Sequence, residues 1–429
     1  MSELKVGCGR RDITPYPEKF GPIDMRGSFS RRPATEVNDP LHARAIYFEG
    51  GGDRAALVTL DLIGTPRELM QDVRARLADT LGLEARQVFI CATHTHSAPA
   101  PGHEDYRDLF VTGICEAVEE AAADAAPAKV STARRLVYGI SFNRRAWQAD
   151  GTVGMYFGYE SQDIVLLDGP IDPVLGVFSF EREDRPRIVL ANFSLHACTA
   201  GGGMISADYP AAFEDCMREV MREPLHLQFT NAPCGNVNHC DLSQPVSNRP
   251  SGILRHETGA ALADAAWRGL KDAREIEAGP VRAISKTLSA QTRGYTDEEL
   301  EAALKVDIYD NSTWGGDFLE ATKKLRIKRC ADWGPSYDLE VGALRFGEAG
   351  LAFMPGEDFV EFAIDIKKRS PLYPHTFAVE LAYDDVSYIP TQEAFPQGGY
   401  TVYSCRFEPG TGEQMVETAL AALKEAAEK

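Results

Sequence analysis

Short apolar runs that alternate with longer helical patterns are the feature of this sequence that most limits its possible folds. The runs Ala45–Phe48 and Ala55–Leu62 have the length of strands and flank a Gly50–Asp53 turn. The segment Arg67–Leu81 instead repeats its apolar positions at helical spacing, and the strand-like run Val88–Ala92 follows it. Because several of the strand-like runs succeed one another through short turns, we expect an α/β protein with a mixed β-sheet core and flanking helices, rather than a purely parallel sheet.

The chain shows no internal boundary that would divide it. Its 429 residues would suffice for roughly two or three domains of ordinary size, but no internal repeat and no linker rich in Pro, Gly and Ser interrupts it. We therefore expect a single domain over residues 1–429. Residues 289–333 are more charged and more helical than their surroundings, and we expect a helical insertion or cap there.

Composition excludes several classes of partner. With 45 Lys and Arg against 64 Asp and Glu, the net charge is −19, which argues against general binding to nucleic acid or to anionic membranes. No run approaches the roughly 20 apolar residues of a membrane span. The first residues lack the apolar core of a secretory signal, and the nine cysteines are sparse and odd in number, so we expect a cytoplasmic protein without a disulfide framework. A small-molecule substrate is the expected partner, and the sequence leaves homo-oligomer formation open.

Polar residues that can bind a metal follow three of the expected strands. His94 and His96 come after Val88–Ala92, His196 ends the run Ile188–Leu195, and Glu357 comes after Leu351–Phe353. Taken singly, each has an ordinary explanation: polar loop histidines, a hydrogen-bonded core histidine, and a carboxylate beside a helix start. Together they share one position, at the carboxyl ends of strands, where α/β proteins bind ligands. Two histidines and a carboxylate also form a catalytic zinc set that leaves a position open for water.

The stretch His94-Thr95-His96-Ser97-x-Pro99 resembles the His-Thr-His-Ser-Gly-Pro signature of neutral/alkaline, non-lysosomal ceramidases. Further segments resemble that family in the same order along nearly the whole chain: Val6–Pro15, Met25-Arg26-Gly27, Asn192-Phe193-x-x-His196, Ser206–Pro210, Pro355-Gly356-Glu357, and Tyr388-Ile389-x-Thr391 with Tyr400 downstream. The resemblance implies a ceramidase-like catalytic domain of mixed α/β fold.

The same resemblance implies roles for individual residues. The family binds one zinc ion per chain through two histidines, a glutamate and a tyrosine, which implies the ligands His94, His196, Glu357 and Tyr388. It further implies that His96 lies beside the metal, aimed at the substrate or at an oxyanion, and that Arg144 and Tyr400 face the substrate.

One departure from the family bears on the chemistry. The segment that carries the family's catalytic serine, Gly-Asp-x-Ser-Pro, reads Gly235-Asn236-Val237-Asn238-His239 here. Asn238 stands at the serine position and cannot act as a serine-like nucleophile, although its amide can hydrogen-bond a substrate. Water activated by a metal needs no serine.

The sequence therefore predicts a zinc-dependent hydrolase of an amide, ester or lactone bond in a small polar substrate. His96 and Tyr400 would donate to the developing oxyanion, Arg144 would pair with a substrate carboxylate or polar group, and His96 or His239 would carry the proton. Two alternatives stay open: a neutral ceramidase that cleaves the N-acyl amide of ceramide, and a non-catalytic protein that binds a metal or ligand on the same scaffold.

The cysteines allow a second interpretation of one loop. Cys234 and Cys240 flank His239 and offer a further metal site or a nucleophile, but their spacing fits no zinc-ribbon pattern, and we expect them to pack the loop. Cys198 lies in an apolar context and is predicted to belong to the core.

Overall fold

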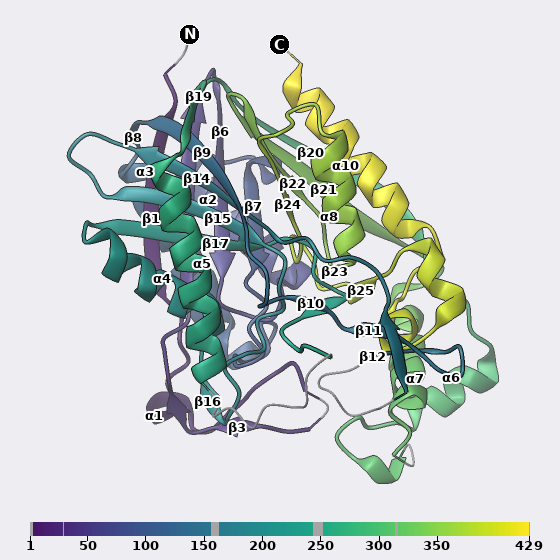
Figure 1. Ribbon diagram of the computed structural model, residues 1–429. Coiled ribbons are helices and arrows are strands. Elements are labelled where there is room, and N and C mark those ends of the chain that lie inside the picture. The colour runs from purple at the N-terminus through teal and green to yellow at the C-terminus, as the bar shows by residue number, and fades with distance from the viewer. Residues whose placement is uncertain (1–2, 29, 156–162, 243–251, 314–315, 429) are drawn as a thin grey trace.

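Three β-sheets form the frame of the molecule (Figure 1). The computed structural model describes residues 3–28, 30–155, 163–242, 252–313 and 316–428. The first sheet has the strand order β7 (Val88–Ala92), β6 (Asp53–Leu60), β5 (His42–Gly50), β1 (Lys5–Asp12) and β8 (Ala126–Pro127). The second has the order β17 (Leu225–Asn231), β15 (Arg187–Phe193), β14 (Val174–Glu181), β9 (Lys129–Leu136) and β19 (Arg274–Ile276). The third has the order β20 (Val281–Gln291), β21 (Ser336–Phe346), β22 (Ala349–Phe353) and β24 (Thr376–Val379).

Each large sheet mixes parallel and antiparallel pairs, as the sequence predicts. The parallel pairs are β6 with β7, β15 with β17, and β22 with β24. Short strands add small sheets near the lower end of the molecule as drawn: β2 (Ile23–Asp24), β3 (Pro33–Ala34), β4 (Glu36–Val37), β10 (Phe142–Asn143), β11 (Arg145–Gln148), β12 (Val153–Met155), β13 (Ile164–Leu167), β16 (Met204–Ile205), β18 (Val237–Asn238), β23 (Glu357–Asp358) and β25 (Tyr388–Ile389).

Aromatic side chains join the three sheets into one core. The ring of Phe48 on β5 lies 5.6 Å from that of Phe180 on β14 and 5.1 Å from that of Phe346 on β21, measured between centroids. Phe178 on β14 also packs against Phe377 on β24, at 4.3 Å. All five side chains are almost fully buried, so the hydrophobic effect holds the sheets together at this junction. The strand ends of all three sheets are thereby fixed relative to one another.

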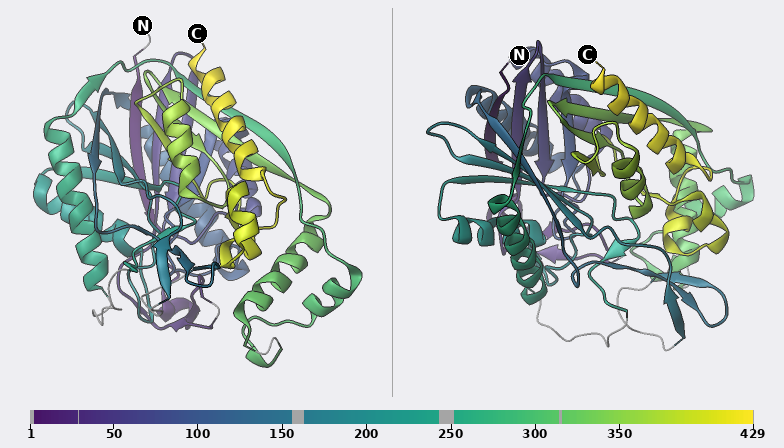
Figure 2. Two further views of the ribbon diagram at one scale, coloured as in Figure 1. Left: turned by 45° about the vertical axis from the view of Figure 1, so that its right-hand side comes forward. Right: turned by 45° about the horizontal axis from the view of Figure 1, so that its top comes forward.

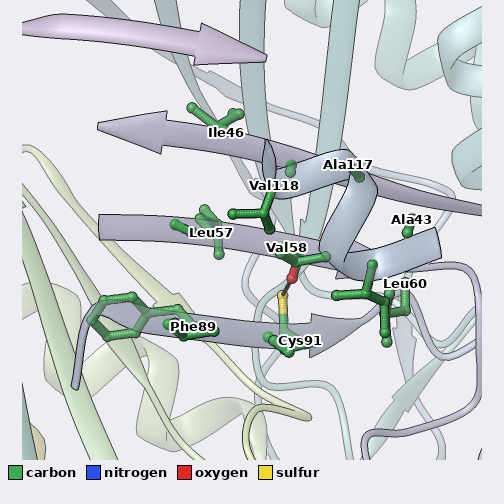
Figure 3. Packing of buried hydrophobic residues seen from close by; sticks show 14 of the residues in the cluster. Ala43, Ile46, Leu57, Val58, Leu60, Phe89, Cys91, Ala117 and Val118 are labelled. Atoms are coloured by element: carbon green, nitrogen blue, oxygen red, sulfur yellow. Dashed lines mark hydrogen bonds between the residues drawn. The ribbon is translucent and has the colours of Figure 1, made fainter. Parts of the chain in front are cut away.

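Helices cover the outer faces of the sheets (Figures 1 and 2). Apolar side chains pack α4 and α5 onto the second sheet, and α8 and α10 onto the third. Figure 3 shows Ala117 and Val118 of α3 against Val58 and Leu60 of the first sheet. The helices are α1 (Pro17–Phe20), α2 (Arg67–Leu81), α3 (Glu104–Ala123), α4 (Asp208–Met221), α5 (Ile253–Lys271), α6 (Asp297–Leu304), α7 (Phe318–Trp333), α8 (Val360–Arg369), α9 (Tyr400–Ser404) and α10 (Thr411–Ala427), with 3-10 turns at Ala85–Gln87, Asn311–Thr313 and Gln392–Gln397.

Two glycines in β1 explain how closely α3 packs on the first sheet. A Cβ atom on Gly7 would lie 2.0 Å from the backbone oxygen of Ala121, and one on Gly9 would lie 2.1 Å from that of Ala117. Any side chain at either position would therefore push the helix away from the strand. Close packing of α3 against β1 thus requires the two glycines of the opening segment Val6–Pro15.

The segment 289–333 joins β20 to β21 at the side of the molecule. Its first residues continue β20, and α6 and α7 then pack against each other, with residues 314–315 outside the described ones. Strand β9 was not expected, because its Arg, Ser and Thr residues hide the strand pattern, yet it pairs with β14 on one side and with β19 on the other. Among the described residues, no helix has the length and apolar character needed to cross a bilayer.

Candidate metal centre

The carboxyl ends of strands from all three sheets meet at one point. His94 and His96 follow β7 of the first sheet, and His196 follows β15 of the second. Glu357 and Tyr388 lie directly opposite each other on the parallel strands β23 and β25, which follow β22 and β24 of the third sheet. The structure therefore brings together, from three distant segments, the side chains that the strand-end pattern singles out, and places beside them Tyr388, which the family resemblance implies.

The side-chain atoms of this group lie within ligand-to-ligand distance of one another. Oε2 of Glu357 is 3.2 Å from Nε2 of His94 and 3.2 Å from Nε2 of His196. Nε2 of His96 is 3.3 Å from Nε2 of His94, so that one ligand atom from each histidine falls within a 4.8 Å cluster. Two ligands that each sit about 2.0 Å from a tetrahedral zinc ion are themselves about 3.3 Å apart, which matches these spacings.

The backbone fixes which nitrogen of each imidazole faces the cluster. Nδ1 of His94, His96 and His196 lies 2.6–2.9 Å from the carbonyl oxygens of Ile63, Gly27 and Cys234, respectively. Because a carbonyl oxygen only accepts, each Nδ1 carries the proton and a neutral ring keeps a lone pair on Nε2. When all three rings are neutral, three lone pairs and a carboxylate face one another and repel, and a cation between them would remove that repulsion. These residues fit a metal ion.

The charges of the cluster suit the same purpose. Burial would raise the pKa of Glu357, but His94 and His196 beside it together outweigh burial and hold that pKa well below its ordinary value. Burial, with the positive charge of Arg144, holds the pKa of His196 well below 6.5, and burial lowers that of His96 to about 3. The pKa of His94 is raised, because Glu357 overcomes the opposing effect of burial. An ionised carboxylate beside two imidazoles that resist protonation suits a metal ion, and His94 would give up its Nε2 proton when the ion binds.

His94 adopts a backbone conformation that is rare for its residue type. Its φ is +66°, in the left-handed region, which costs a residue with a side chain on the order of 1 kcal/mol. The turn is held by hydrogen bonds from the His94 amide to Leu62 O at 3.0 Å and from the His96 amide to Ala197 O at 3.0 Å. This local strain turns both rings toward the cluster.

Two tyrosines and an arginine surround the cluster. The Tyr388 hydroxyl hydrogen-bonds Glu357 and accepts from Nη2 of Arg144 at 3.1 Å. Nη2 of Arg144 also donates to Gly235 O at 2.6 Å, and the buried guanidinium keeps its charge because Tyr388 and Glu357 offset the effect of burial on its pKa. Tyr400 hydrogen-bonds Tyr388, and burial raises the pKa of Tyr400 to about 12, so its hydroxyl is a proton donor at neutral pH.

A cavity of about 630 Å³ opens onto this group. His96, His196, Arg144, Tyr388 and Tyr400 all line it, as does His239, whose Nδ1 is 3.4 Å from Sγ of Cys198. Asn238 is fully buried and its side-chain oxygen accepts from the amide of Cys240 at 2.8 Å; it is not one of the described residues that line the cavity. The volume of the cavity falls in the range of pockets that bind small molecules.

The cysteines behave differently from one another. Cys198 was predicted to lie in the core, but it is partly exposed in the wall of the cavity, because the chain leaves β15 before reaching it. Cys234 is fully buried, its thiol donates to Glu380 at 2.8 Å, and burial raises its pKa well above the ordinary value, so it packs the loop as predicted. Cys240 is partly exposed and lines the cavity.

Sequence reasoning missed Arg32, which also lines the cavity. Only Gly27, Ser28 and Ser30 of the described cavity residues lie near it in the sequence, and the next one is His96. The cluster of Arg26, Arg31 and Arg32 in a strongly acidic chain was the available signal.

Gly27 of the same loop lies so close to His96 that a Cβ there would be 2.4 Å from the ring Nδ1.

Comparison with known proteins finds similarity to neutral ceramidases. No family model matches the chain. A neutral ceramidase from Mycobacterium tuberculosis (strain ATCC 25618 / H37Rv) is 33% identical over 160 residues, which is 33% of this chain and 25% of that protein, so the match spans a quarter of the relative's length. The fold is similar to the crystal structure of neutral ceramidase from Pseudomonas aeruginosa, with a TM-score of 0.73 and 17% identity over 100% of this chain and 76% of that one. A ceramidase complexed with C2 gives a TM-score of 0.76 and 20% identity, over 99% of this chain and 76% of that one. The resemblance to neutral ceramidases, and the mixed α/β fold that it implied, are confirmed.

Proposed function

We propose that this protein is a zinc-dependent hydrolase that cleaves an acyl bond of a small substrate, with an amide as the first candidate and an ester or lactone as the others. The observation that carries the proposal is the convergence of the Nε2 atoms of three histidines and the Glu357 carboxylate beside a cavity of about 630 Å³. The amide is placed first because the similar proteins are named as ceramidases, and ceramide is an N-acyl amide.

Four residues would hold the zinc ion: His94, His196, Glu357 and Tyr388. When bound, zinc supplies a Lewis acid and a source of hydroxide at neutral pH. Arg144 supports this set, because its Nη2 donates to the Tyr388 hydroxyl and to Gly235 O and so fixes the tyrosine in place. The Nδ1–H bonds to backbone carbonyls orient both histidines, as outer partners of metal ligands ordinarily do.

The remaining chemistry falls to residues on the cavity wall. Tyr400 presents a phenol that stays protonated at neutral pH, and such a donor to an oxyanion is typically worth about 3–4 kcal/mol. Nε2 of His96 carries a lone pair beside the cluster and can accept a proton in the reaction. His239, which also lines the cavity, is the second candidate for that role. Asn238 is proposed as a support of this loop through its bond to Cys240.

His96 has two possible roles that one variant separates. As a proton carrier, it would leave metal binding intact when replaced by alanine while turnover falls; as a metal ligand, its loss would lower the metal content as well. Its 3.3 Å distance from His94 suits either role, so both readouts are needed.

The first test is the metal content of purified protein by mass spectrometry, for the wild type and for His94→Ala and His196→Ala. We expect about one zinc per chain in the wild type and a loss in both variants. His226→Asn is the matched control, since His226 is also buried but lies outside the cluster. Equal zinc content in all four proteins would refute the proposed site.

The second test is hydrolysis of a panel of N-acyl amides, esters and lactones, with chelator-treated enzyme as the control. Zinc-dependent turnover would support the proposal and rank the three bond types. Ceramide in detergent belongs in the same panel, because preferred cleavage of ceramide would instead identify a true ceramidase, the function that the fold comparisons favour as the alternative. Bound zinc without any turnover would indicate a non-catalytic binding protein.

A further inference from the structure

Arg32 contributes to the cavity a positive charge that the protein itself leaves without a counterion. Its Nη2 donates to two backbone carbonyls, Arg26 O at 2.7 Å and His96 O at 2.6 Å. Its Nε is buried with no hydrogen-bond partner, and none of the carboxylates that the structure describes forms an ion pair with it. The nearest acidic group is Asp24, whose two oxygens accept instead from the Arg32 backbone amide at 3.2 Å and pair with Arg31 at 3.4 Å.

Three buried arginines away from the cavity pair with carboxylates instead. Arg44 pairs with Asp61 and Glu214, Arg145 pairs with Asp168, and Arg182 pairs with Asp124. Partly burying a guanidinium without a counterion is unfavourable, and a chain with a net charge of −19 has many carboxylates to offer. The two carbonyl bonds hold Arg32 in place but do not neutralise it. An anion from outside the chain would.

We propose that Arg32 binds the carboxylate of an anionic substrate, so that the enzyme selects acyl compounds that carry a carboxylate, such as N-acyl amino acids, over their neutral counterparts. This inference rests on the proposed function and narrows its substrate class. Arg32 is bonded directly to the backbone of His96, so its charge stands at the edge of the histidine cluster. A small molecule can thus place its carbonyl group at the cluster and its carboxylate at Arg32. Nη1, which makes no bond to the described residues, remains to donate a charge-assisted hydrogen bond.

The test compares N-benzoylglycine with N-benzoylglycinamide, which share the scissile amide and differ in the terminal charge. The readout is the ratio of their kcat/KM values in the wild type, Arg32→Gln, Arg32→Lys and Arg31→Gln. Arg31 is the matched control, because it neighbours Arg32 but is exposed, ion-paired to Asp24, and absent from the described cavity lining. Thermal unfolding and zinc content of each variant show whether it is folded and loaded.

We expect the wild type to prefer the carboxylate, and Arg32→Gln to lower that ratio about 10- to 100-fold, the value of one hydrogen bond to a charged group. Arg32→Lys should retain part of the preference, and Arg31→Gln should keep the wild-type ratio. An equal rate for both compounds in the wild type, or an equal loss of the ratio in Arg31→Gln and Arg32→Gln, would overturn the inference.

The failure of the proposed function is a separate outcome. If the wild type hydrolyses neither compound, both stay intact during an equilibrium measurement. Their Kd values can then be compared directly by ligand-observed NMR. Tighter binding of N-benzoylglycine that is lost in Arg32→Gln would then support an anion site in a protein that is not this hydrolase. Equal Kd values for the two compounds would refute the anion site itself.

Discussion

Two of the buried clusters of charged side chains that the structure describes are built on opposite principles. In the first, which we term the arginine network, Arg44 pairs with Asp61 at 2.5 Å and with Glu214 at 2.8 Å, and Glu214 also accepts from Arg10 at 2.6 Å. It ties α4 to the first sheet. In the second, the proposed metal centre, which we call the metal centre below, the Nε2 atoms of two histidines face the Glu357 carboxylate, with a third histidine beside them.

The difference separates a structural cluster from a functional one. Every carboxylate of the arginine network meets a guanidinium, so the network is complete within the chain. At the metal centre each histidine donates its Nδ1 proton to a backbone carbonyl and turns Nε2 toward the cluster, where a bound cation would be shared by the histidines and Glu357. Both clusters are largely buried, and their donor and acceptor groups are what distinguish them.

The largest expected effect comes from removing the charge of the metal centre. Glu357→Gln keeps the shape of the side chain but offers a neutral amide to the two histidines. We expect zinc to be lost and turnover to fall at least about 1000-fold, as removal of a metal ligand removes the Lewis acid. Metal analysis and steady-state kinetics on one preparation would check both.

Glu380→Gln is the matched control for that variant. Glu380 is fully buried and accepts from Cys234 at 2.8 Å and from the Asp358 amide at 2.8 Å, but burial raises its pKa to about 8, so it is largely neutral at pH 7. We expect Glu380→Gln to keep its zinc. Equal zinc loss in both variants would contradict the proposal that Glu357 binds the metal and that Glu380 does not.

The sequence predicted most of the metal centre because strand ends are easy to locate. His94, His196 and Glu357 each follow an apolar run, and α2 and β7 occupy the predicted residues Arg67–Leu81 and Val88–Ala92. A resemblance of motifs then added Tyr388, which no periodicity singles out. Residues held by a strand end are thus accessible to pattern reasoning, because the strand fixes where they point.

The remaining features depend on packing that no local pattern encodes. Arg32 reaches the cavity through a bond to the backbone of His96, a contact between residues 64 positions apart. Strand β9 exists because β14 and β19 pair with its two edges, although its own residues are mostly polar. The burial of Asn238 likewise follows from the pairing of β18 with β10, where it lies opposite Phe142.

The next largest effect should come from breaking the arginine network. Glu214→Gln would leave Arg44 and Arg10 without one of their counterions in a buried site. We expect a loss of about 3 kcal/mol in the free energy of unfolding, measured by urea denaturation, because removing one partner of a buried pair leaves an uncompensated charge. Zinc content should not change. Zinc loss without loss of stability would show that this cluster serves the site and not the fold.

The pH dependence of that loss is a smaller effect with a defined sign. Burial would raise the pKa of Glu214, but Arg44 and Arg10 hold it well below the ordinary 4.5. A carboxyl whose pKa is depressed on folding contributes its full stability above the unfolded value of about 4.3, and loses it as the pH falls toward the folded value. The difference in unfolding free energy between wild type and Glu214→Gln should therefore stay constant from pH 7 to 5 and shrink by about 1.4 kcal/mol per pH unit below that. A gap that widens on acidification would contradict the assignment.

The smallest effect should come from the exposed edge of the same network. Arg218 also bonds Glu214, at 2.7 Å and one helical turn away, but its side chain is 44% exposed. Solvent screens such a pair, so Arg218→Gln should cost only about 0.3–0.5 kcal/mol, and less at high salt. Urea denaturation at two salt concentrations, alongside Glu214→Gln, would measure both. If Arg218→Gln proved as costly as Glu214→Gln, the stability would depend on the number of ion pairs around Glu214 and not on their burial. The arginine network would then differ from the metal centre only in which of its side chains carry a proton.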